Sequence, residues 1–198
     1  PGVTHVQKVA LKGGLLKSGN QFEGVVYKGV SQDYQWQVLK KFLVSGNFPQ
    51  FGEIASNEIL VSEVIAQRLS VAEGDEVTAY FQNPQNQQLP NVRKFKIAGL
   101  FLSGFPDFDE NFVLGDLRHI QRINKWKKDE IGSYEVFTRD LNTSFSVGSS
   151  IYPKLPSNLD VIEITRQYAT IFQWISLFDF NILIIIILMI VVGVINMS

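Results

Sequence analysis

The C-terminal stretch of the chain, Ile182 to Ser198, limits its possible folds more than any other feature. Fourteen consecutive residues, Ile182 to Ile195, form an apolar run (ILIIIILMIVVGVI), and no charged side chain follows Asp179. A helix that crosses the hydrocarbon core of a bilayer needs about 20 mostly apolar residues. A buried helix of a soluble domain is the alternative, but such helices usually keep a polar face, and this run has none before Asn196. We therefore predict that residues 180–198 begin a transmembrane helix.

The charge balance of the chain excludes one large class of function. Of its 198 residues, 18 are basic and 19 are acidic, which gives a net charge of −1. This balance carries no electrostatic footprint of a nucleic-acid-binding protein. Cysteine is absent, which excludes a scaffold held by disulfides and leaves the compartment open. Because cytoplasmic flanks of membrane helices tend to be basic and no Lys or Arg follows Arg166, we expect this flank to be extracytoplasmic.

Before the apolar run, strand and helix patterns alternate irregularly, which predicts an α+β fold. Segments 76–81 and 92–102 have strand character and flank a polar loop with two prolines, so we expect a hairpin. Ser62 and Asp116 are of the residue types that cap helices, and apolar residues at helical spacing follow each of them. We expect helices at both places.

Other segments complete the prediction. Residues 3–16 are expected to form a strand that turns at Gly13-Gly14. Asp33 is expected to cap a helix, and residues 161–165 to form a strand. A helix over 168–178 is expected to continue directly into the apolar run.

No pattern of titratable side chains points to catalysis or to a metal. His5 and His119 lack a carboxylate or a second histidine at ligand spacing, so surface or structural roles are expected. Asp107, Asp109 and Glu110 form an acidic cluster, but a calcium loop needs more oxygen ligands and a glycine at its sharp turn. We interpret this cluster as a solvated turn. The phosphate-binding pattern G-x-x-x-x-G-K-[ST] is absent from the sequence, so we predict neither a catalytic site nor a cofactor.

Several stretches together resemble one family. Residues 57–77 (NEILVSEVIAQRLSVAEGDEV) resemble the strand, helix and Gly-Asp-x-Val turn of the MacB/FtsX-type permease superfamily, and residues 95–104 (FKIAGLFLSG) resemble its following strand. Residues 108–114 (FDENFVL) and Gln121 are similar to the lipoprotein-releasing branch, the LolC/LolE-type permeases. Trp174, Leu177-Phe178 and the apolar run are similar to the way that branch enters its second membrane helix.

The resemblance implies a mixed periplasmic core domain of a MacB-like permease over residues 1–179. It implies two α/β subdomains, one made of residues 1–50 and 116–179 and the other an insertion of residues 51–115. The domain would lie in the periplasm, between the first and second membrane helices of a permease in the bacterial inner membrane.

The resemblance also implies a function and a set of partners. In this branch a separate cytoplasmic subunit hydrolyses ATP, so the chain would be a transport subunit without enzymatic activity of its own. It would help to release lipoproteins from the inner membrane and to hand them to a periplasmic chaperone. The implied partners are the ATPase subunit, a second permease copy or a paralogue, the lipoprotein, its chaperone and the membrane.

Two surfaces are candidates for contact with these partners. Residues 82–91 lie where the chaperone-contacting permease of the family carries a protruding hairpin, and the alternative is a hairpin tip that has no partner. Its candidate contacts are Pro84, Leu89 and Pro90. The second surface is either an aromatic belt at the lipid headgroups or the wall of a cavity that receives acyl chains. Its members are Tyr168, Phe172, Trp174, Phe178 and Phe180.

Other functions remain open at this stage. Within the superfamily, the chain would alternatively belong to a MacB-like efflux pump or to an FtsX-like activator of cell-wall hydrolases. A membrane-anchored enzyme or sensor with a soluble ectodomain is the alternative of a different class.

Overall fold

The computed structural model of the chain describes residues 2–84, 89–157 and 159–196 and has the predicted α+β class. Its strands are β1 Val3–Ser18, β2 Gln21–Val30, β3 Leu43–Gly46, β4 Glu58–Ser62, β5 Glu76–Phe81, β6 Asn91–Phe101, β7 Phe112–Asp116 and β8 Ser133–Thr138. Its α-helices are α1 Trp36–Leu39, α2 Glu63–Leu69, α3 Pro106–Asp109, α4 Leu117–Asn124, α5 Leu141–Ile151, α6 Ile164–Gln167 and α7 Ala169–Asn196. Two 3-10 helices are η1 Lys40–Phe42 and η2 Tyr152–Lys154.

The chain divides into two compact units. One comprises residues 5–136, and the other comprises residues 1–4 together with residues 137–198. The subdomains that the resemblance implies, residues 1–50 with 116–179 and residues 51–115, stay a prediction. Strands β1 and β2 pair with β5 and β7, respectively.

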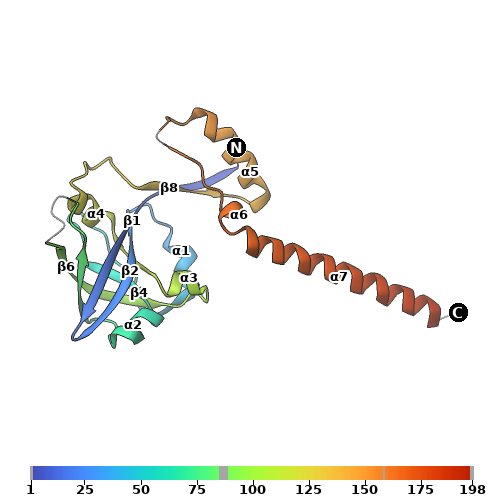
Figure 1. Cartoon of the computed structure of the whole chain (residues 1–198), viewed down its shortest axis with the longest axis horizontal. Coiled ribbons are helices and arrows are strands. Elements are labelled where there is room, and N and C mark those ends of the chain that lie inside the picture. Colours follow the sequence, from blue (N-terminus) through green and yellow to red (C-terminus); the bar gives the residue numbers. More distant parts are fainter. Residues whose placement is uncertain (1, 85–88, 158, 197–198) are drawn as a thin grey trace. The chain divides into compact units, whose positions relative to one another are not determined.

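Strand pairing in the larger unit closes into a ring of six strands (Figure 1). Strand β1 pairs antiparallel with β2 and with β5, β5 pairs antiparallel with β6, and β4 pairs antiparallel with β7. The pairs β2–β7 and β4–β6 are parallel. Strand β3 pairs with β6, and β8 lies beside β1 in the sheet order. The six strands therefore form a barrel.

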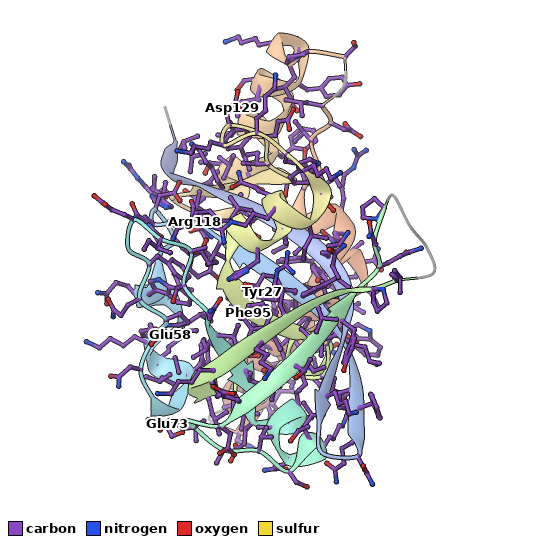
Figure 2. All side chains as sticks on the ribbon, turned by 90° about the vertical axis from the view of Figure 1, so that its left-hand side faces the viewer. Tyr27, Glu58, Glu73, Phe95, Arg118 and Asp129 are labelled. Atoms are coloured by element: carbon purple, nitrogen blue, oxygen red, sulfur yellow. The ribbon has the colours of Figure 1, made fainter. Side chains whose placement is uncertain are left out.

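The interior of the barrel is filled by aromatic and aliphatic side chains. In β5 they alternate, so that Val77, Ala79 and Phe81 are buried and the intervening residues are not. Tyr27 is fully buried and stacks on Phe95, with 5.3 Å between the ring centroids; Figure 2 labels both residues. The Tyr27 ring also meets the edge of Phe81, with 5.6 Å between the centroids. The Tyr27 hydroxyl donates to the carbonyl of Asp116 at 3.2 Å, so its one polar group is satisfied. Each such ring contributes about 1.5–3 kcal/mol by leaving water.

Two helices add apolar side chains to this core, and both begin at the predicted caps. The Ser62 side chain accepts a hydrogen bond from the Ile65 N–H at the start of α2, and Asp116 accepts from the Arg118 N–H at the start of α4. One face of each helix is buried in the core cluster. The buried residues are Ile65, Ala66 and Leu69 from α2, and Leu117, Ile120 and Ile123 from α4.

Two predictions for the larger unit are wrong. Residues 3–16 do not turn at Gly13-Gly14, because β1 continues to Ser18. A Cβ at Gly14 would lie 2.8 Å from the Phe81 ring, so this glycine makes room for a core residue within the strand. Asp33 does not cap a helix. Helix α1 begins at Trp36 after Gln35, and the Asp33 carboxylate accepts from the Ser31 hydroxyl instead.

The smaller unit is dominated by a long helix. Helix α7 follows α6 through Tyr168, whose carbonyl accepts from the N–H groups of Ile171 and Phe172, as the predicted continuation requires. It has 28 residues, or about 42 Å at 1.5 Å per residue, and its most apolar window has a mean hydropathy of 2.9. Among the described residues it is the one helix long and apolar enough to cross a bilayer.

The strand predicted over residues 161–165 is also wrong. Residues 161–163 have no regular structure, and α6 starts at Ile164. β-Branched residues favour strands chiefly through packing against neighbouring strands. Within the described residues, no strand pairs with this segment.

The close approach of Gly115 to Tyr27 yields a test of the barrel core. A Cβ at Gly115 would overlap the hydroxyl oxygen of Tyr27, whose side chain is fully buried. We predict that Gly115→Ala lowers the free energy of unfolding by about 1–3 kcal/mol in urea titrations of the chain in mild detergent. Gly24→Ala is the matched control, because a Cβ there meets no atom within 4 Å. Equal stability of the two variants would contradict this packing.

Candidate functional site

The predicted hairpin exists, and described residues on both sides of its tip are exposed. Strands β5 and β6 pair antiparallel from Glu76↔Lys96 to Phe81↔Asn91. Pro84, Leu89 and Pro90 are all exposed, with Leu89 at 65%. Residues 85–88 of the predicted contact loop lie outside the described residues. The hairpin therefore offers a small set of apolar side chains beyond the end of the barrel strands.

The second predicted surface belongs to the smaller unit. Tyr168 lies between α6 and α7 and is half-buried, as is Phe172. Trp174, Phe178 and Phe180 are each more than half exposed. Trp174 and Phe178 are four residues apart, so they share one face of α7. The structure thus brings the aromatic residues together on one helical segment, whereas the hairpin belongs to the other unit.

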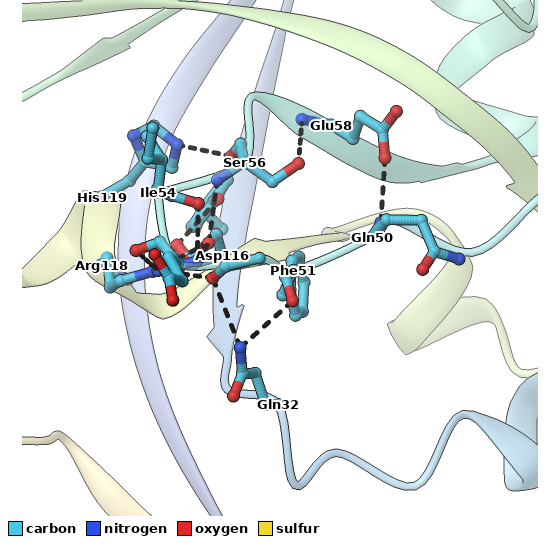
Figure 3. Close-up of polar contacts among 12 residues, drawn as sticks. Gln32, Gln50, Phe51, Ile54, Ser56, Glu58, Asp116, Arg118 and His119 are labelled. Carbon is cyan, nitrogen blue, oxygen red and sulfur yellow. Dashed lines mark hydrogen bonds and ion pairs between the residues drawn. The ribbon is translucent and has the colours of Figure 1, made fainter.

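A polar network that the sequence did not predict fixes a loop beside the barrel (Figure 3). The Asp116 carboxylate forms an ion pair with Arg118 and accepts from the Ser56 N–H at 3.0 Å. The Arg118 guanidinium also donates to the carbonyls of Gly52, Glu53 and Ile54 at 2.9, 2.8 and 3.0 Å. Although burial alone would raise it, hydrogen bonds from Arg118 and Ser56 hold the pKa of Asp116 below its ordinary value. The only signal for this network in the sequence was Asp116, which is of a residue type that caps helices, followed two positions later by Arg118.

His119 lies beside this network and has a structural role. It is 2% exposed, its Nε2 donates to the Ser56 carbonyl at 2.8 Å, and its ring meets the edge of Phe95 at 4.9 Å. Its Nδ1 has no hydrogen-bond partner among the described residues. Burial lowers the pKa of His119 below its ordinary value, and the nearby Arg93 and Arg122 add to this effect.

The acidic cluster has a more specific role than the predicted solvated turn. Asp109 is 3% exposed, and its carboxylate accepts from the Ser103 N–H, the Ser103 hydroxyl and the Gly104 N–H at 2.7–2.9 Å. These bonds fix the turn between β6 and α3. Among the described residues, no three or more His, Cys, Asp or Glu side chains form a group that could hold a metal ion.

Comparisons with known proteins place the fold among transporter domains. The extracellular domain of the noncanonic ABC-type transporter YknZ from Gram-positive bacteria is 16% identical, with a TM-score of 0.53 over 82% of this chain and 79% of that one. The periplasmic region of MacB from Actinobacillus actinomycetemcomitans is also 16% identical, with a TM-score of 0.52 over 77% of this chain and 66% of that one. The chain has the MacB-like periplasmic fold.

Sequence comparison adds one curated relative of this MacB-like domain. The lipoprotein-releasing system transmembrane protein LolC of Xylella fastidiosa is 22% identical over 163 residues, which cover 80% of this chain and 39% of LolC. The chain thus spans about two fifths of the length of that relative. No protein-family model matches the sequence.

The burial of His119 predicts a pH dependence of stability. The pKa of His119 is lowered in the folded chain, whereas the unfolded chain takes up a proton at this histidine near pH 6.5. The free energy of unfolding should therefore fall as the pH is lowered through this value. The contribution is at most about 1.4 kcal/mol per pH unit. His119→Gln keeps a donor for the Ser56 carbonyl and should weaken the dependence in urea titrations between about pH 7.5 and 5. The same dependence in both proteins would contradict the prediction.

Proposed function

We propose that the chain is the periplasmic domain of an ABC transporter permease that helps to release lipoproteins from the bacterial inner membrane. In this proposal a separate cytoplasmic subunit hydrolyses ATP, and the released lipoprotein passes to a periplasmic chaperone. The observation that carries the proposal is the combination of a MacB-like fold with a LolC relative over 80% of the chain. The apolar helix α7 agrees with attachment to a membrane.

The free energy needed to extract a lipid-anchored protein agrees with a domain whose motion is coupled to ATP hydrolysis. Each acyl CH₂ that leaves the bilayer costs about 0.8 kcal/mol, so extraction of a lipid-anchored protein requires an external source of free energy. The given sequence carries no phosphate-binding loop. The proposal places ATP hydrolysis on a separate cytoplasmic subunit. Helix α7 is continuous from Ala169 to Asn196, which suits it to transmit motion along its length.

The two exposed apolar surfaces take different parts in this proposal. The β5–β6 hairpin tip is assigned to the chaperone, because its exposed Pro84, Leu89 and Pro90 can fill an apolar site on a protein partner. The aromatic residues at the start of α7 are assigned to the membrane interface or to the lipoprotein acyl chains. Trp174, Phe178 and Phe180 are the exposed members of this set.

Depletion of the full-length permease in cells tests the proposed reaction. We predict that lipoproteins bound for the outer membrane accumulate in the inner membrane, as measured by fractionation of labelled lipoproteins. Re-expression of the wild-type protein should restore their distribution. An unchanged distribution would contradict lipoprotein release.

An efflux function is the second candidate, because MacB shares the fold with a TM-score of 0.52. It predicts the opposite pattern in the same depletion, namely increased sensitivity to exported compounds with normal lipoprotein distribution.

The hairpin contact has its own test. We predict that Leu89→Asp in the full-length permease reduces capture of the purified lipoprotein chaperone by about ten-fold or more, since a charge replaces a central apolar contact. Val44→Asp is the matched control, because Val44 is 51% exposed on β3, which pairs with β6 at Leu100 and Phe101, the end of β6 remote from the hairpin loop. Chaperone capture that survives deletion of residues 82–91 would show that the hairpin is not the contact.

A further inference from the structure

The smaller unit contains a hollow lined by α5 and by the segment that leads into α6, here called the α5–α6 hollow (Figure 1). Its volume is about 390 Å³, and it opens to solvent. Small-molecule sites commonly measure about 300–1,000 Å³. All of its lining belongs to the one compact unit. The lining combines two aromatic rings, two carboxylates and a guanidinium, which belong to Phe145, Tyr152, Asp160, Glu163 and Arg166.

A glycine of α5 leaves room for one of these carboxylates. Gly148 is buried, and a Cβ there would lie 3.0 Å from Glu163 Oε1 and 3.4 Å from Val161 Cγ1. Glycine is less favourable than alanine in the interior of a helix, so its use here serves this close approach. Helix α5 therefore packs directly against residues 161–163, and this packing holds Glu163 half-buried at the hollow.

The charged side chains of the hollow do not neutralise one another. Among the described residues, the ion pairs join other side chains, and none includes Asp160, Glu163 or Arg166. The Asp160 carboxylate accepts from the Val161 N–H at 2.7 Å, a neutral donor that leaves its charge in place. The hollow therefore presents two carboxylates and one guanidinium to a ligand.

This set of groups indicates the chemistry of the ligand. Two carboxylates beside one guanidinium disfavour a phosphate or another anion and favour a cation. An arginine side chain fits best, because its planar guanidinium pairs with carboxylates and stacks on aromatic rings. Phe145 and Tyr152 offer such rings and are 64% and 59% exposed. Arg166 can donate to main-chain carbonyls of the same ligand. The hollow thus fits an extended peptide that carries a basic side chain.

The position of the hollow along the chain separates it from lipid headgroups. Arg166 closely precedes α7, whose residues 169–181 come before the apolar run and extend about 20 Å at 1.5 Å per residue. The headgroup layer on each side of a bilayer is only about 5–8 Å thick. If α7 enters the hydrocarbon core at Ile182, the hollow lies above the headgroups. An extended polypeptide anchored in the bilayer covers this height in about six residues.

We propose that the α5–α6 hollow binds a basic side chain of a lipoprotein, about six or more residues from its lipid anchor. The inference rests on the proposed function, which supplies a membrane-anchored polypeptide as the ligand. The aromatic rings contact the aliphatic stem of the side chain, and Asp160 and Glu163 pair with its charge. Such a contact holds the polypeptide above the membrane while its acyl chains leave the bilayer.

Binding of short peptides to the whole chain in mild detergent tests this contact. The probe is a fluorescent nine-residue Gly-Ser peptide with one central arginine. Its control carries citrulline, which has nearly the same shape without the charge. We predict that the arginine peptide binds about five-fold more tightly in fluorescence anisotropy, and that added salt reduces this difference. Equal affinities, or no binding of either peptide at millimolar concentration, would overturn the proposal.

Substitution of the carboxylates assigns the binding to the hollow. Glu163→Gln should reduce the preference for arginine to about two-fold or less, because the half-buried charge is lost. Asp160→Asn, in the exposed segment before α6, is a second variant that should also lower it. Glu76→Gln is the matched control, since it makes the same change on an exposed residue of β5. Circular dichroism verifies that the variants keep their helix content. An unchanged preference in both hollow variants would show that arginine binds elsewhere.

A lipid headgroup is the competing ligand, because phosphatidylethanolamine also carries an ammonium group. Soluble dihexanoyl phosphatidylethanolamine, added below its micelle concentration, should not displace the arginine peptide. Displacement would make the hollow a headgroup site, and the proposal would be wrong.

These results are distinguishable from those for the proposed function. If depletion of the permease confirms lipoprotein release and the chain shows no preference for arginine, the hollow is not a contact of the substrate. If the preference is found and lipoproteins are distributed normally after depletion, the hollow binds a different peptide and the lipoprotein assignment fails.

Discussion

Closure of six strands around Tyr27 is the constraint on which the rest of the structure depends. Strand β1 is long enough to pair with β2 on one side and with β5 on the other, and these pairs close the ring. Closure pairs the strand edges that an open sheet would leave exposed. The buried rings of Tyr27, Phe81 and Phe95 fill the interior, so partner contacts must be made from the outside. The proposed contacts therefore lie on loops, which run over the surface of a domain and often carry its function.

Local signals predicted the local structure well. Ser62 and Asp116 cap the expected helices, and the β5–β6 hairpin was evident from two strand patterns around a proline-containing loop. These features depend on residues that are close in sequence. The turn predicted at Gly13-Gly14 is wrong because Gly14 makes room for Phe81, which is remote in sequence. The strand predicted over 161–165 is wrong because a strand also needs a neighbouring strand to pair with, which the β-propensity of its residues does not provide.

The surfaces were predicted unevenly for the same reason. The exposed Pro84, Leu89 and Pro90 of the hairpin loop and the aromatic residues of α7 could be named from composition and position alone. The Arg118 network could not, because it joins a helix start to carbonyls more than 60 residues away in sequence. Ring closure was missed likewise, since β1–β5 and β2–β7 are non-local pairs. The family resemblance, in contrast, predicted the MacB-like fold that the structural comparisons show.

We propose that this fold serves a permease that works with a separate ATPase, and purification of the full-length protein from membranes tests that claim most directly. The sequence of that protein should contain four membrane spans with this domain between the first two, and an ABC-type ATPase subunit should copurify with it in stoichiometric amount. A protein with a single span that copurifies with no ATPase would be a membrane-anchored ectodomain, which would contradict the account.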